Sequence, residues 1–63
     1  MKTWDTIQDA HAVQQLINKK ERLRLGVCVS MESDDSYTKF YLKYRDEQFR
    51  SLGHVTEEDV KNI

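Results

Sequence analysis

Residues 23–31 read LRLGVCVSM, a stretch in which every second residue is apolar. Such a period of two is typical of a β-strand that buries one face. A second alternating run, KFYLKYR at residues 39–45, follows after a short polar segment. That segment, SDDS at residues 33–36, consists of residues that favour turns. Together these features predict an antiparallel β-hairpin over about residues 23–32 and 37–45.

The apolar positions of the two runs also predict how the strands pair. With residues 33–36 as the turn, the expected opposite pairs are Met31 and Thr38, Val29 and Phe40, Val27 and Leu42, and Leu25 and Tyr44. All of these pairs are apolar or nearly so, and a slip by one residue would turn the apolar side chains to the other face.

Before the hairpin, the sequence predicts an amphipathic helix from Asp5 or Thr6, either of which can serve as N-cap, to about Lys20. Its apolar residues recur at spacings of three and four, which is typical of a helix with one buried face. They are Ile7, Ala10, Val13, Leu16 and Ile17. The polar residues expected on or toward the outside are Gln8, Gln14, Gln15 and Lys19. We expect Trp4 to fold over the helix start or to cover the sheet rim.

Residues 46–52 fit two local structures. Asp46 and Glu47 could turn the chain into a third strand that places Phe49 beside Tyr44. Alternatively, the segment forms one or two helical turns that end at Gly53, because glycine commonly ends helices. The sequence leaves both possibilities open.

The tail carries the signals of a short helix. Thr56 is placed to cap it, with Asp59 at the third helical position and with Val55 and Val60 as a hydrophobic staple. The predicted fold class is therefore α+β, in one domain over residues 1–63. An N-terminal helix packs on an antiparallel sheet of two or three strands, and a short helix ends the chain.

Size and charge limit the classes of function. A chain of 63 residues with a formal charge of -1 does not favour binding of nucleic acid or membranes through bulk charge. No apolar stretch approaches the roughly 18 residues that cross a membrane, and the N-terminus lacks the apolar core of a signal peptide. Cys28 is the single cysteine, so no internal disulfide can form, and we expect a cytoplasmic protein. A core this small favours a partner chain as additional support.

The sequence predicts neither catalysis nor a bound metal or cofactor. His11, Cys28 and His54 are the candidate soft ligands, and no metal-binding spacing relates them. The chain has two glycines and no glycine-rich phosphate loop. A fold of this size also has difficulty enclosing a ligand pocket.

The outer face of the predicted hairpin mixes basic and aromatic residues, since Tyr37 and Tyr41 alternate with Lys39 and Lys43. Sheets that bind single-stranded nucleic acids combine cations for phosphates with rings that stack on bases. The same pattern also suits a solvated or protein-contacting face. The residues of the nucleic-acid alternative are Arg24, Lys39, Tyr41, Lys43 and Arg45.

An uncovered sheet edge presents unpaired backbone groups that can pair with another chain. The first expectation is therefore a small non-catalytic interaction protein that regulates a larger protein partner and forms a homodimer. Aromatic side chains dominate such contacts, which makes Trp4, Tyr37 and Tyr41 the candidate contact residues. A nucleic-acid-binding module is the alternative.

Overall fold

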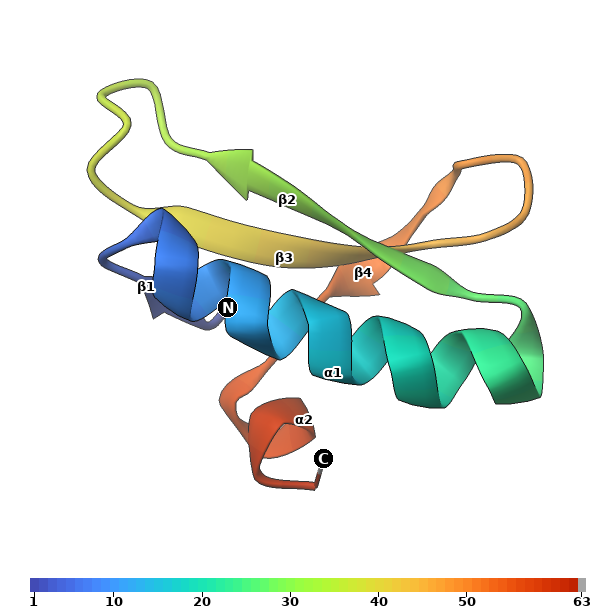
Figure 1. Cartoon of the computed structure of the whole chain (residues 1–63). Helices are drawn as coiled ribbons and strands as arrows, with labels where there is room; N and C mark the ends of the chain where they lie inside the picture. Colours follow the sequence, from blue (N-terminus) through green and yellow to red (C-terminus); the bar gives the residue numbers. More distant parts are fainter. Residues whose placement is uncertain (63) are drawn as a thin grey trace.

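The computed structural model describes residues 1–62, and the description covers all of their side chains except those of residues 21–25. The elements are β1 (Thr3–Trp4), α1 (Ile7–Leu25), β2 (Cys28–Ser33), β3 (Phe40–Arg45), β4 (Ser51–His54) and α2 (Glu57–Lys61). The four strands form one antiparallel sheet, and α1 runs along one face of it (Figure 1). This arrangement confirms the predicted α+β class.

Strand β3 lies in the middle of the sheet. It pairs with β2 along one edge, while β1 and β4 share its other edge at opposite ends. The two-residue strand β1 was not predicted as a strand, but Trp4 pairs with Phe40 and thus covers the sheet rim as expected.

Helix α1 begins as predicted and ends later than predicted. The Asp9 N–H donates to Oγ1 of the Thr6 cap over 3.2 Å. The helix continues to Leu25 and ends at Gly26, whose φ of 69° is the left-handed conformation that favours glycine. The prediction that residues 23–25 belong to a strand is therefore wrong, because no helix-breaking residue precedes Gly26.

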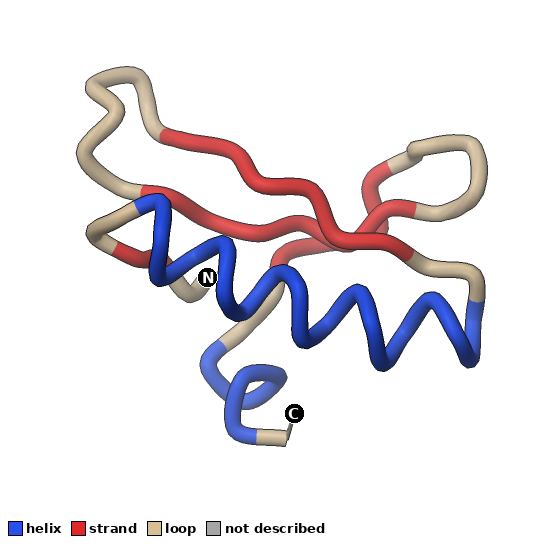
Figure 2. Tube along the Cα trace, in the orientation of Figure 1, coloured by secondary structure: helices blue, strands red, loops and turns tan. Residues whose placement is uncertain are grey.

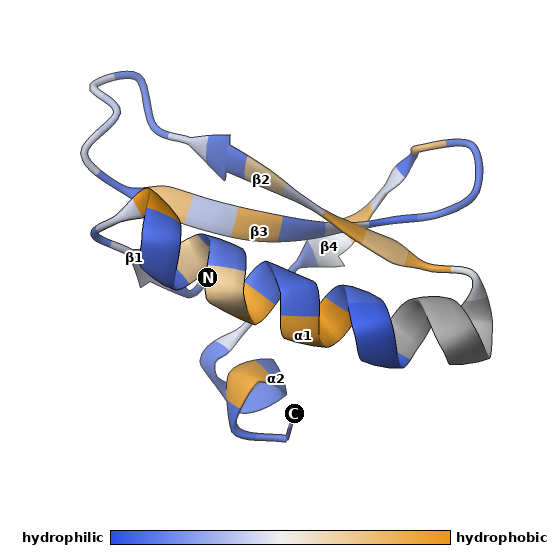
Figure 3. Ribbon diagram, viewed as in Figure 1, coloured by the Kyte–Doolittle hydropathy of each residue, from blue (hydrophilic) through white to orange (hydrophobic). Residues whose placement is uncertain are grey.

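The pairing of β2 with β3 differs from the prediction by four residues. Met31 lies opposite Leu42, and Val29 lies opposite Tyr44. The loop is longer than expected because the Asp34 carboxylate accepts hydrogen bonds from the N–H groups of Thr38 (2.9 Å) and Lys39 (3.3 Å). Since the shift is an even number of residues, Val29, Met31, Phe40 and Leu42 still belong to the face that packs on the core, and the hydropathy of β3 alternates along the ribbon (Figure 3).

Residues 46–50 form a tight turn that leads into a further strand of the sheet, as one of the two alternatives predicts, and the helical alternative is wrong. The Asp46 N–H donates to the Arg50 carbonyl, and the Phe49 N–H donates to the Asp46 carbonyl. Strand β4 begins only after this turn, and Gly53 takes the place opposite Tyr44 that was expected for Phe49.

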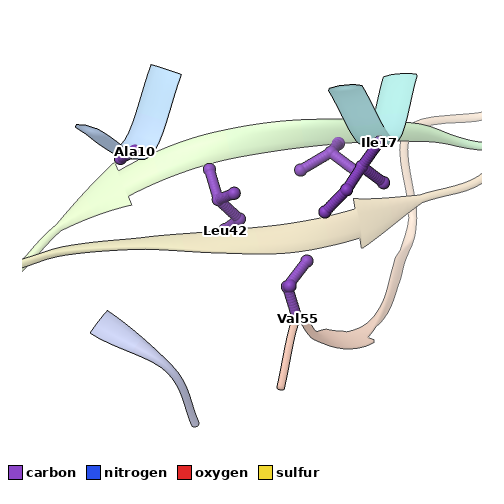
Figure 4. Close-up of a cluster of buried hydrophobic side chains, with 5 residues drawn as sticks. Ala10, Ile17, Leu42 and Val55 are labelled. Atoms are coloured by element: carbon purple, nitrogen blue, oxygen red, sulfur yellow. The ribbon is translucent and has the colours of Figure 1, made fainter. Parts of the chain in front are cut away.

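The core joins α1, the sheet and the segment after β4. Its buried residues are Ala10, Ile17, Val29, Leu42 and Val55 (Figure 4). Ile7 and Leu16, predicted to be part of the buried stripe, are instead 56% and 54% exposed. The helix is turned about its axis relative to the prediction, because Gln14 and Asn18 also face the sheet and hydrogen-bond to Val29.

The short helix α2 confirms the predicted cap. The Asp59 N–H donates to Thr56 Oγ1 over 3.2 Å, and the Thr56 N–H donates to the Asp59 carboxylate over 3.0 Å. Val55 is buried and Val60 packs against the core, as expected for a hydrophobic staple.

Candidate functional site

Strand β2 forms an edge of the sheet, and the register decides which of its backbone groups face outward. The Asp34 N–H donates to the Lys39 carbonyl. Because hydrogen-bonded and non-hydrogen-bonded pairs alternate in an antiparallel ladder, Glu32 and Ser30 bond to β3. The outward-pointing backbone groups of the strand therefore belong to Val29, Met31 and Ser33.

Two helix amides close this edge at Val29. The Val29 N–H donates to Asn18 Oδ1 over 2.6 Å, and Gln14 Nε2 donates to the Val29 carbonyl over 2.9 Å. Among the described groups, which leave out the side chains of residues 21–25, no hydrogen bond satisfies the outward groups of Met31 and Ser33. We call these two residues the open edge.

A shallow groove with a volume of about 270 Å³ lies beside the open edge. We call it the edge groove, and its lining residues are Ile7, Met31, Glu32, Ser33, Tyr37 and Phe40. Its lining residues come from the start of α1, the end of β2, the loop after it and the start of β3, segments that lie at one end of the molecule (Figure 2). Ile7, which is half exposed and does not belong to the core, contributes apolar surface to the edge groove.

Tyr37 lies on the rim of the edge groove in an unusual backbone conformation. Its φ is 56°, and the residue is 75% exposed. Its N–H donates to the Asp34 carbonyl over 3.1 Å and closes a turn. Glycine or asparagine is favoured at positions with positive φ, so an exposed tyrosine here contributes little to folding.

Replacing Tyr37 with glycine is expected to stabilise the fold by about 0.5–1 kcal/mol, because it relieves the left-handed strain while removing little packing. Chemical denaturation measures the change. The control is Ser36→Gly in the same loop, at a position without positive φ, which should destabilise slightly. Equal effects of the two substitutions would contradict strain at Tyr37.

The outer sheet face carries a charged cluster centred on Glu32. Its carboxylate accepts hydrogen bonds from the Tyr41 hydroxyl (3.0 Å) and Arg45 Nη2 (2.6 Å), and Lys43 Nζ lies 3.4 Å away. The hydrogen bond from Tyr41, followed by the interactions with Lys43 and Arg45, lowers the pKa of Glu32. The side chains of Lys43 and Arg45 are only 19% and 16% exposed. Both cations of this cluster therefore share one carboxylate, which leaves the cluster with one excess positive charge.

The residues of the nucleic-acid alternative are not gathered as expected. Lys39 forms an ion pair with Asp5, and Lys43 and Arg45 pair with Glu32. Arg24 does not join this set on the sheet, because it belongs to α1 and Cys28 lies opposite Arg45; the Arg24 side chain lies outside the described residues. A phosphate would have to compete with a carboxylate at Lys39, Lys43 and Arg45.

The three candidate protein contacts lie in different environments. Trp4 packs partly buried against the core, with Lys2 Nζ 5.8 Å from its ring centroid. Tyr41 is held by Glu32 and contacts the ring of His54 at 5.3 Å between centroids. Tyr37 alone among these three residues lines the edge groove.

The sequence predicts an uncovered sheet edge but not which residues of that edge stay open. Only the pair of amides at Gln14 and Asn18, four residues apart beside the apolar stripe, hinted that α1 bonds to a strand edge. Among the described side chains, no group of three His, Cys, Asp or Glu residues could hold a metal ion. No helix within residues 1–62 is long and apolar enough to cross a membrane.

Comparison with known proteins finds no matching family, no similar curated protein and no similar solved structure. The function is therefore inferred from the open edge, the edge groove and the chemistry around them.

Proposed function

We propose that this chain is a small non-catalytic interaction protein that binds a larger protein partner by adding a strand to β2. One observation carries the proposal: the outward backbone groups of Met31 and Ser33 lie unpaired beside an apolar groove. Strand addition uses such backbone groups for affinity and neighbouring pockets for alternate side chains.

The edge groove supplies the second requirement. Side chains of an added strand that point to the inner face would contact Ile7, Met31 and Phe40. Tyr37 stands exposed on the rim, where an aromatic ring can cover the added strand. Its unfavourable backbone conformation is consistent with a residue retained for binding.

A homodimer is a less favourable use of the same edge. The symmetric register that uses both open residues pairs Met31 with Ser33 of a second copy, and it places the two Glu32 residues opposite each other. Each Glu32 lies between Lys43 and Arg45, so this register brings two clusters of like net charge together, which destabilises a strand pair. A different protein is therefore the proposed partner.

The test uses two substitutions at one residue. Ser33→Pro removes an outward N–H but no bond to β3, whereas Ser33→Ala keeps the N–H. In a pull-down from native lysate after nuclease treatment, the wild type and Ser33→Ala should retain one partner. Ser33→Pro should retain about tenfold less, since each 1.4 kcal/mol of binding is a factor of ten.

Circular dichroism should show that both variants fold. Equal retention by Ser33→Pro would contradict binding at the open edge. Loss of all bound material on nuclease treatment would instead favour the nucleic-acid alternative, for which Lys43→Glu is the next variant.

A further inference from the structure

The surface around the edge groove is acidic. The segments 5–9 and 34–39, which flank the groove at the start of α1 and in the β2–β3 loop, contain four aspartates and one lysine. That lysine, Lys39, already pairs with Asp5. Asp35 is exposed, and no ion pair joins it to a described side chain, whereas Asp9 lies about 200° around α1 from Ile7 and faces away from the groove. The loop that directly follows the open edge, with Asp34 and Asp35, therefore carries negative charge that its one lysine does not neutralise.

The open edge is also short. Two outward residues, Met31 and Ser33, offer two N–H and two C=O groups, and the helix amides block continuation past Val29. An added strand can therefore form regular pairs over about three residues. The rest of its affinity must come from the groove and from charges near the ends of the added segment.

A second copy of this chain does not suit the site. It would bring two equally acidic loops together and oppose the two Glu32 carboxylates. Charge complementarity suppresses wrong partners and increases association rates, so the acidic rim favours a cationic segment.

We infer that the open edge binds a short extended segment of another protein, apolar at alternate positions and flanked by lysine or arginine. This inference rests on the proposed function and adds the chemistry of the partner. The valine-like side chains would enter the edge groove beside Ile7 and Met31, and a flanking cation would lie near Asp34 and Asp35, which directly follow Ser33.

Two synthetic heptapeptides of alternating valine and threonine test the inference, one with a lysine at each end and one with a glutamate at each end. Each is titrated into the full chain labelled with ¹⁵N. We expect the lysine-flanked peptide to shift the amide signals of Met31 and Ser33. We also expect it to bind at least about tenfold more tightly than the glutamate-flanked peptide at low salt, with a smaller difference at high salt.

Two charge variants provide a matched control. Asp35→Lys reverses a charge beside the groove, whereas Glu58→Lys reverses one in α2, away from it. The preference for the lysine-flanked peptide should shrink in Asp35→Lys and persist in Glu58→Lys. Equal shrinkage would show a non-specific effect of net charge and would overturn the acidic rim as its cause.

The other outcomes separate this inference from the proposed function. If both peptides bind equally at Met31 and Ser33, the charge preference is wrong and strand addition stands. If these amide signals shift with protein concentration alone, a second copy occupies the edge and the inference is overturned. If neither peptide shifts the amide signals of Met31 and Ser33 at millimolar concentration, the inference fails. The pull-down with Ser33→Pro then tests the proposed function independently.

Discussion

Leu42→Ala is expected to lower the free energy of unfolding by about 2–5 kcal/mol, the usual range for removing a buried leucine side chain. Leu42 is 0% exposed in the middle strand and belongs to the cluster that joins α1 to the sheet. Domains of this size rarely have more than about 3–5 kcal/mol of total stability. Urea denaturation followed by circular dichroism should therefore find much of this variant unfolded at 25 °C.

Leu16→Ala is the matched control. The periodicity of α1 places Leu16 in the buried stripe, but the structure leaves it 54% exposed. Since alanine favours helix and little packing is lost, the free energy of unfolding should change by no more than about 0.5 kcal/mol. A similar loss of stability in both variants would contradict the orientation of α1.

The hairpin shows how far the alternation of side chains predicts a sheet. A period of two correctly assigns Val29, Met31 and Leu42 to the inner face, because any even shift in register keeps them there. It does not determine the partner of each residue. That depends on the turn, which closes at Asp34 and Lys39 through hydrogen bonds from the loop backbone to the Asp34 side chain.

The stretch before Gly26 shows a second limit of predicting strands from a period of two. Residues 23–25 alternate as a strand would, yet they extend α1. Three residues are too few to distinguish a period of two from one of 3.6. The glycine with positive φ is the actual boundary, and its position in the sequence also suits a helix end.

The candidate site depends on both of these undetermined features. Which backbone groups of β2 face outward follows from the register, and which of them are covered follows from the rotation of α1. The bond between Asn18 and Val29 joins residues eleven apart that belong to different elements. Local patterns predict the elements, but such contacts arise only when the elements pack.

Asn18→Ala is expected to cost about 1–3 kcal/mol, because it leaves the partly buried Val29 N–H without its hydrogen-bond acceptor. Thermal or urea denaturation measures this loss. Gln15→Ala, an exposed position on the same helix, is the control and should change stability by no more than about 0.5 kcal/mol.

Removing the side-chain amides of Gln14 and Asn18 should also change how the chain associates with itself. With Val29 uncovered, two β2 strands can pair in a register that sets Met31 against Met31 and Ser30 against Glu32, which avoids the opposition of two Glu32 residues. The bonds from Gln14 and Asn18 to Val29 block this register in the wild type. Natural proteins cover their sheet edges against such pairing.

Light scattering should therefore show a concentration-dependent dimer for the double variant Gln14→Ala, Asn18→Ala, in which both backbone groups of Val29 are free. Adding Ser33→Pro should return it to a monomer, because the proline removes an N–H that the new pairing needs. A double variant that stays monomeric at millimolar concentration would contradict this role of the two amides. In that case the acidic loops, rather than the covered Val29, would be what prevents self-pairing of β2.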